Sequence, residues 1–160
     1  MLKKVLLTGL LVFLTILVYC QDNTASTEKL KINKSALYGG LGITPVYGHI
    51  TVNYEYMFAQ RPDKAFKYRG VRVGSGMYQY FADASLNTII SYMCLTGTEN
   101  KHFELGLGVS YMHFTTLERR YIAPAPNAGY RYQKPDGKFI FRTGIGFPEL
   151  LYVSFGYAIN

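Results

Sequence analysis

The sequence predicts an all-β protein, an antiparallel up-and-down transmembrane β-barrel of about eight strands. The two closing segments, 139–147 and 151–160, alternate between large apolar residues on one face and small or polar residues on the other. Strands of about ten residues with this alternation are typical of membrane barrels. Glycine is frequent, tyrosine numbers 15 and tryptophan is absent. Turn signals recur at short intervals, which also favours strands over helices.

The chain divides into a signal peptide (1–20), a flexible leader (21–34) and a barrel domain (35–160). The first segment begins with lysines and continues with an apolar run that is short for a membrane span, as expected of a cleaved secretory signal. Residues 21–34 are polar and without aromatic side chains, which predicts a flexible segment. Cleavage after Cys20 leaves Cys94 as the single thiol and excludes an intrachain disulfide.

Two alternatives remain for the first segment. It could persist as a helical anchor, but a spanning helix needs about 20 apolar residues. It could also be a degraded lipoprotein signal with Cys20 as the lipidated residue, although Tyr19 stands where a small residue is expected. The sequence alone does not choose between cleavage and lipidation at Cys20.

The first three predicted strands cover 36–43, 48–58 and 67–79. Thr44-Pro45 closes the first of them. The second alternates most clearly, and the polar stretch 59–66 separates it from the third. One face of the second strand carries Ile50, Val52, Tyr54, Tyr56 and Phe58.

The fourth and fifth strands are predicted at 86–95 and 102–114, with 81–84 as the connection before them. The fourth is the least regular, because Ile89 and Ile90 fall on opposite faces. A polar turn near Gly97 joins the two strands. The fifth strand alternates through its whole length, as expected of a barrel strand.

Residues 115–127 contain Pro124 and Pro126 and form the longest break in the pattern, so we expect a loop there. The sixth strand follows at 129–134. Asp136-Gly137 then predicts a hairpin turn into the strands at 139–147 and 151–160. An even strand number returns both termini to one side of the membrane, here expected to be the periplasmic side, with the turns near Gly97 and Asp136. The 115–127 loop is then extracellular.

The polar face of the predicted strands distinguishes a membrane barrel from a soluble sandwich or barrel. In a soluble sandwich that face meets water and is dominated by charged residues and threonine. Here it is rich in glycine, and small residues suit the narrow interior of a closed eight-stranded barrel. The opposite face is rich in tyrosine and phenylalanine near strand ends, as in the aromatic belts of membrane barrels. The inward glycines are Gly40, Gly42, Gly74, Gly76, Gly106, Gly108, Gly144, Gly146 and Gly156.

The chain resembles the small eight-stranded outer-membrane β-barrel proteins of Gram-negative bacteria. The most particular segments are 101–108 (KHFELGLG), 129–137 (GYRYQKPDG) and 139–144 (FIFRTG). The closing segment 154–160 is similar to the terminal strand signal that the outer-membrane insertion machinery reads, except that Asn160 replaces the usual final aromatic residue. The resemblance implies an outer-membrane location, surrounding outer-membrane lipids and a partnership with the insertion machinery. Members of such families range from structural anchors to adhesins and lipid-modifying enzymes.

Charged residues on the predicted inner face are the main candidate site. Charges inside a narrow barrel must be paired or hydrated. We therefore expect a structural network of glutamate and arginine that fills the interior, with a proton- or ion-conducting gate as the alternative. An open pore is not expected, because eight strands enclose too little space. The five residues are Glu55, Arg72, Glu104, Arg131 and Arg142.

No catalytic residue, cofactor site or metal site is predicted. The three histidines are dispersed, without metal-ligand spacing. A lipid-modifying enzyme, an acyl hydrolase or acyltransferase, could use the outward-facing His113, but it needs a serine partner. Ser110 is on the inward face, and Ser75 faces outward at an unknown depth. The favoured function is therefore a non-enzymatic structural or surface-binding role, with the enzyme and a soluble periplasmic ligand-binding barrel as alternatives.

The charge distribution limits the possible partners. The formal net charge is +7 and the basic residues are scattered along the strands, which argues against nucleic acid. Anionic lipid head groups are a better match for a modest positive charge. Arg119, Arg120 and Tyr121 in the predicted extracellular loop are the candidates for contact with sugar phosphates or with an extracellular partner that the sequence does not identify.

Overall fold

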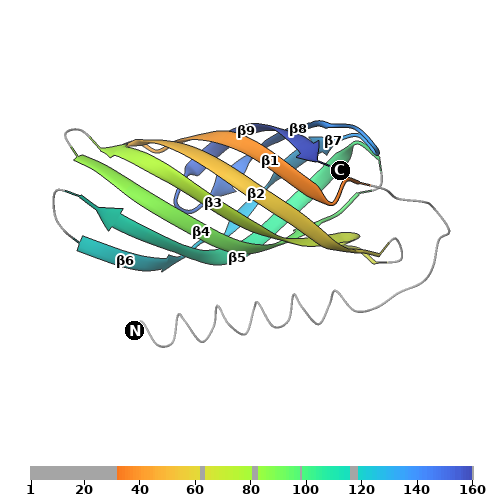
Figure 1. Cartoon of the computed structure of the whole chain (residues 1–160), viewed down its shortest axis with the longest axis horizontal. Coiled ribbons are helices and arrows are strands. Elements are labelled where there is room, and N and C mark those ends of the chain that lie inside the picture. The colour runs from red at the N-terminus through yellow and green to blue at the C-terminus, as the bar shows by residue number, and fades with distance from the viewer. Residues whose placement is uncertain (1–31, 62–63, 81–82, 98, 116–118, 160) are drawn as a thin grey trace.

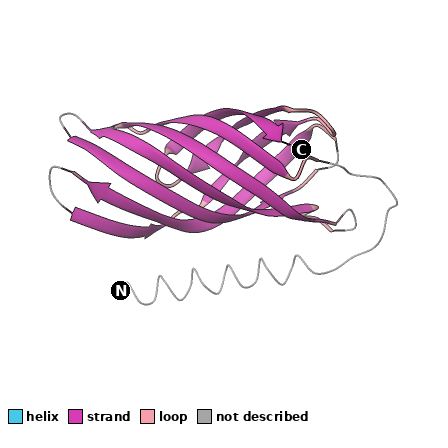
Figure 2. Ribbon diagram, in the orientation of Figure 1, coloured by secondary structure: helices cyan, strands magenta, loops and turns pink. Residues whose placement is uncertain are grey.

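The computed structural model describes residues 32–61, 64–80, 83–97, 99–115 and 119–159. The predicted signal peptide and all but the last three residues of the predicted leader lie outside this part of the chain. Every regular element among the described residues is a β-strand (Figure 2). None of these residues forms a helix of the length and hydrophobicity needed to cross a membrane.

The strands form a single closed wall, seen in Figure 1 as a cylinder of tilted strands. Every pairing is antiparallel: β1 to β5 pair in chain order, β5 pairs with both β6 and β7, β7 to β9 pair in chain order, and β1 pairs with β9 to close the wall. The strands are β1 (Ser35–Ile43), β2 (Gly48–Gln60), β3 (Tyr68–Tyr80), β4 (Asp83–Leu95), β5 (Lys101–Phe114), β6 (Arg119–Pro124), β7 (Asn127–Gln133), β8 (Phe139–Gly146) and β9 (Leu150–Ile159).

The segments β6 and β7 are two halves of one barrel strand. Both pair with β5, and the register passes from Val109↔Pro124 to Gly106↔Asn127 without a shift. Between them, Ala125 exchanges two backbone hydrogen bonds with Gly108, of 2.8 and 3.2 Å. The nine segments therefore occupy eight positions in the wall, and the predicted eight-stranded up-and-down antiparallel barrel is confirmed.

The prediction of a loop over 115–127 is wrong, because β6 occupies its centre and β7 begins at Asn127. Since Ala125 bonds to β5, the backbone groups of Pro124 and Pro126 point away from β5. Their missing N–H groups thus face the other edge, where β6 pairs with no strand among the described residues. A sheet tolerates proline at such an edge, so the prolines that suggested a loop are compatible with a strand.

The alternation that predicted the strands determines which side chains face the interior. In β2, buried and exposed residues alternate from Gly48 to Phe58. In β4, the irregular strand, Ile89 is buried and Ile90 is exposed, so each lies on a different face of the wall. That strand begins at Asp83, and residues 83 and 84 belong to it rather than to the predicted connection.

The two ends of the barrel differ in what they contain. At one end, called here the terminal end, Ser35 of β1 lies opposite Ile159 of β9, beside the turns that follow β2, β4 and β7. At the other end, called the turn end, lie the connections that follow β1, β3, β5 and β8 (Figure 1). The β5–β6 hairpin extends beyond the β8–β9 turn at this end, because β8 ends at Gly146 opposite Asn127.

Candidate functional site

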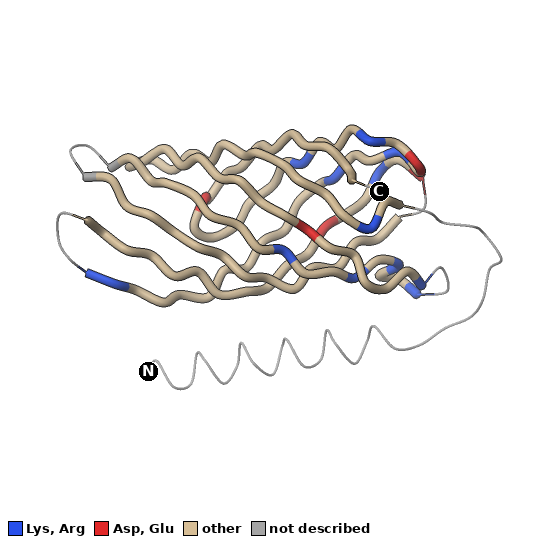
Figure 3. The backbone as a smooth tube through the Cα atoms, in the orientation of Figure 1, with Lys and Arg blue, Asp and Glu red and all other residues tan. Residues whose placement is uncertain are grey.

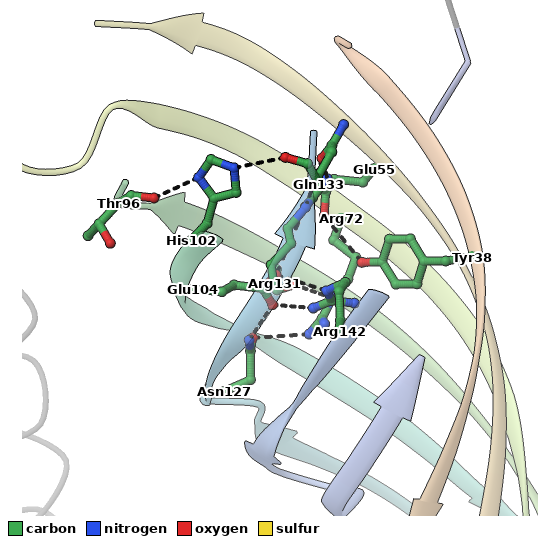
Figure 4. A network of polar contacts seen from close by, with 11 residues as sticks. Tyr38, Glu55, Arg72, Thr96, His102, Glu104, Asn127, Arg131, Gln133 and Arg142 are labelled. Atoms are coloured by element: carbon green, nitrogen blue, oxygen red, sulfur yellow. Dashed lines mark hydrogen bonds and ion pairs between the residues drawn. The ribbon is translucent and has the colours of Figure 1, made fainter. Parts of the chain in front are cut away.

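The barrel interior contains a connected group of polar and charged side chains from seven strand segments (Figure 4). All five charged residues predicted for the inner face are buried there, and each is at most 4% exposed. Successive side chains of a strand point to opposite faces. A charged residue that shares a face with the small inward residues must therefore also point into the barrel. The charges are Glu55 on β2, Arg72 on β3, Glu104 on β5, Arg131 on β7 and Arg142 on β8.

Glu104 is the centre of this group, which we call the interior network. Its Oε2 accepts a hydrogen bond from Nε of Arg142 at 2.8 Å, and its Oε1 accepts one from a terminal nitrogen of the same guanidinium. This is a two-point pairing of the kind that makes arginine–carboxylate contacts strong. Nη1 of Arg131 lies 3.9 Å from Oε2, and Nδ2 of Asn127 donates to Oε1 at 3.0 Å. Three hydrogen bonds from two residues and one ion pair with Arg131 thus surround one carboxylate.

Glu55 is held by a second arginine from across the barrel. Nη1 of Arg131 donates to its Oε1 at 2.5 Å, and the hydroxyl of Tyr38 donates to its Oε2 at 3.3 Å. The other nitrogens of Arg131 donate to Oε1 of Gln133, at 3.0 Å from Nε and 2.6 Å from Nη2. Arg131 therefore links both carboxylates, and each nitrogen of this fully buried guanidinium has a hydrogen-bond acceptor.

Arg72 joins the network without a carboxylate of its own. Its Nε donates to Oγ of Ser91 at 3.0 Å, and Nη2 donates to Oδ1 of Asn127 at 3.2 Å. Asn127 thus bridges Arg72 and Glu104. Glu55 lies directly opposite Arg72 in the β2–β3 register but pairs with Arg131 instead. Register neighbours in this barrel are therefore not the ion partners.

Three arginines and two glutamates leave the interior network with one excess positive charge. Aromatic rings help to accommodate it, because the guanidinium carbon of Arg142 lies 4.3 Å from the ring centroid of Tyr38 and 5.5 Å from that of Tyr152. Tyr38 fits because its cross-strand neighbour is Gly156, where a Cβ would collide with the backbone and Cβ of Tyr38. The interior network therefore places paired, buried side chains in the half of the interior nearest the terminal end.

A second polar cluster lies in the interior near the turn end, and the sequence did not predict it. The ring of His49 stacks on Tyr78 with centroids 4.0 Å apart, and Nε2 of His49 lies 3.0 Å from Oδ1 of Asn87. Nδ1 of His49 lies 3.9 Å from a carboxylate oxygen of Glu149 in the β8–β9 turn. Tyr47, in the β1–β2 turn, packs edge-on against Tyr78. Partial burial and the negative charge of Glu149 raise the pKa of Tyr47.

The residues considered for lipid chemistry are not brought together. Ser110 is fully buried in the interior, whereas His113 pairs in register with Leu86, whose side chain faces outward. Ser75 is exposed, but it lies on β3, two strands from β5. Neighbouring strands are about 4.8 Å apart, so the backbones carrying Ser75 and His113 are about 10 Å apart. Within the described part of the chain, no three His, Cys, Asp or Glu residues are grouped to hold a metal ion.

The third candidate group, Arg119, Arg120 and Tyr121, lies on β6 at the turn end. All three side chains are exposed, and Nη1 of Arg119 donates to the Tyr121 hydroxyl at 3.5 Å. Tyr121 also packs edge-on against Phe114 across the hairpin, with centroids 5.6 Å apart. The group therefore sits on a paired strand instead of a loop, with a defined backbone.

Comparison of this chain with protein-family models, with curated proteins and with solved structures finds no match.

Proposed function

We propose that this chain is an outer-membrane β-barrel protein with a structural or surface-binding role and a closed interior. The observation that carries the proposal is the outward face of the wall, where every strand exposes large apolar side chains. Soluble monomers rarely expose an apolar surface larger than a few hundred Å². Examples from the nine segments in order are Leu41, Val52, Val73, Ile90, Val109, Ile122, Tyr130, Ile145 and Phe155.

The inverted arrangement of polarity supports a membrane over water as the surrounding medium. The interior holds the charges of the network, while the exterior holds Ile122, 76% exposed, and Leu41, 60% exposed. A soluble barrel gains stability by the opposite distribution, with apolar side chains inside. The closed wall also suits a bilayer, because an unpaired strand edge in hydrocarbon leaves backbone groups without partners. The unpaired edge of β6 lies at the turn end, beyond the last residue of β8.

The outer membrane is the proposed location on three grounds. The first residues have the composition of a secretory signal, and the strand number and size resemble those of small outer-membrane barrels. The final strand, β9, directs five large apolar side chains outward, a pattern suited to recognition by the insertion machinery. They are Leu151, Val153, Phe155, Tyr157 and Ile159.

We expect the mature protein to fractionate with the outer membrane and to migrate faster on a gel before heating than after heating, because a closed barrel resists detergent unfolding. In planar bilayers the inserted protein should show no stepwise conductance, because the interior network and the cluster around His49 fill the interior. A boiled sample and a soluble periplasmic marker are the controls. Recovery of the folded protein with that marker would contradict a membrane location, and steady open-channel currents would contradict a closed interior.

The exposed β6 surface is the proposed contact site, with sugar phosphates of the outer leaflet as its ligand class. Two adjacent arginines can bind phosphate oxygens with charge-assisted hydrogen bonds. Deleting residues 115–127, a natural test of a loop, is unsuitable here because it removes a barrel strand paired with β5. Point substitutions keep the strand and are the appropriate test.

Replacing Arg119 and Arg120 together with glutamine should weaken binding of purified lipopolysaccharide to the folded protein about tenfold, the loss that one charge-assisted hydrogen bond explains. The matched control is the pair Lys134→Gln and Lys138→Gln, which removes the same charge at the opposite end of the barrel. Titration of labelled lipopolysaccharide in detergent measures both. An equal loss in the two pairs would show that net charge, and not the β6 surface, determines binding.

A further inference from the structure

The charged residues outside the interior are unevenly distributed between the two ends of the barrel (Figure 3). The terminal end carries a ring of seven cations, called here the basic rim, around the starts and ends of the strands. Only two acidic residues, Glu99 and Asp136, accompany them among the described residues of this end. The basic rim consists of Lys34, Arg61, Lys64, Lys67, Lys101, Lys134 and Lys138.

Within the described ranges, the cations of the basic rim form no ion pair. The ion pairs among the described residues involve His49, Glu149 and four members of the interior network, and none of them includes a rim cation. Five of the rim side chains are exposed and two are half-buried. Like charges placed around one circumference repel each other, so the arrangement calls for anions outside the chain.

The rim also lies at a defined depth relative to the apolar face. Lys138 immediately precedes the outward Phe139, and Lys101 is two residues before the outward Phe103. The ammonium of Lys138 sits 5.5 Å from the ring centroid of Tyr157, which also faces outward. Tyrosine and lysine side chains at the edge of an apolar belt occupy the head-group layer of a bilayer. The rim cations are therefore at the level of lipid phosphates.

We propose that the basic rim is a binding surface for anionic phospholipid head groups of the leaflet at the terminal end. The proposal rests on the proposed membrane location, and it adds the class of lipid and the leaflet. Each lysine near an anionic lipid surface contributes about 1 kcal/mol to binding. At the turn end, the cations on described residues are limited to the β6 pair, so the preference for anionic phospholipid belongs to one side of the barrel.

The test is lipid competition on the folded, full-length mature protein. The barrel is first inserted into vesicles of phosphatidylcholine, and insertion is measured by the gel shift. The purified barrel in detergent is then titrated with an equimolar mixture of phosphatidylglycerol and phosphatidylcholine, and bound lipids are counted by native mass spectrometry. We expect phosphatidylglycerol to be preferred, and Lys134→Gln with Lys138→Gln to reduce this preference about fivefold for each lysine removed.

The control pair, Lys134→Arg with Lys138→Arg, should leave the preference nearly unchanged, because it keeps both cations at the terminal end. Insertion into phosphatidylcholine without any preference for phosphatidylglycerol would overturn the lipid surface while leaving the membrane barrel standing. Failure to insert would overturn both proposals. Displacement of the lipid by glycerophosphate at equal phosphate concentration would show a simple anion site and contradict the lipid-binding surface. Binding to peptidoglycan sacculi in place of lipid would contradict it as well.

Discussion

Replacing Glu104 with glutamine should lower the free energy of unfolding by about 3–5 kcal/mol, the usual loss when a buried charge loses its partner. Arg131 and Arg142 face each other in the β7–β8 register, and both contact Glu104. With the carboxylate gone, two buried guanidinium groups become like-charged neighbours in a site where neither reaches water. Arg131 keeps Glu55, but Arg142 has no second carboxylate among the described residues. Urea unfolding of the barrel in lipid vesicles measures the change.

A double-mutant cycle separates the interaction between Glu104 and Arg142 from the contacts that each makes with other residues. Arg142→Met should be destabilising by a similar amount, and the double variant should lose less than the two single losses added together, by about 1–3 kcal/mol. Glu149→Gln is the matched control, because Glu149 is 8% exposed and its ion contact is a single 3.9 Å approach to His49. It should cost less than about 1 kcal/mol. Additive losses for Glu104 and Arg142 would disprove their coupling.

The sequence was sufficient to predict the barrel because its signal is local. Alternation along β2 and β9 divides the side chains between the two faces of the wall. The face with the small and polar residues is the inner one, and the charges lie on that face. The same reasoning placed Glu55, Arg72, Glu104, Arg131 and Arg142 on the inner face, where the structure has them. These conclusions need only the period of a strand, and no knowledge of which strands are neighbours.

The partners within the interior were not predictable for a geometric reason. Glu55 on β2 pairs with Arg131 on β7, across the barrel interior, while its register neighbour Arg72 reaches Ser91 and Asn127. Such cross-interior contacts depend on barrel diameter, on strand stagger and on side-chain length together. Tyr38 and Gln133 were missed as network members, although their inward phase was readable, and Asn127 was missed because it fell in the predicted loop. The signal that could have identified further network members was the presence of polar residues on the same face as the buried charges.

The β6 strand was missed because Pro124 and Pro126 are normally signs of a loop. A proline removes one backbone donor, but the damage depends on which way that donor would point. Here it points to an edge where β6 has no partner strand among the described residues. The sequence alone does not reveal in which direction the backbone groups of these prolines point, because that direction is set by the pairing of β6 with β5. The consequence is that the candidate residues Arg119 and Arg120 sit on a strand paired with β5, not on a loop.

An arginine in place of Val73 should separate a membrane barrel from a soluble one. Val73 lies in the middle of β3, faces outward and is 46% exposed. In a bilayer this position is near the midplane, where an outward arginine on a barrel costs about 2–4 kcal/mol. On a water-facing surface the same change stays within about 0.5 kcal/mol, because the guanidinium is solvated.

The control for this substitution is Phe139→Arg, which also places an arginine on the outward face but at the terminal end, beside Lys138. Phe139 is 54% exposed, so the two sites differ mainly in depth. Near the membrane interface the expected cost is about 0–1 kcal/mol, because the side chain reaches the head groups. Unfolding of both variants in phosphatidylcholine vesicles gives the comparison. If Val73→Arg costs no more than Phe139→Arg, hydrocarbon does not surround the middle of the barrel. The reason is that the cost of an outward arginine depends on its depth in a membrane, whereas in water it does not.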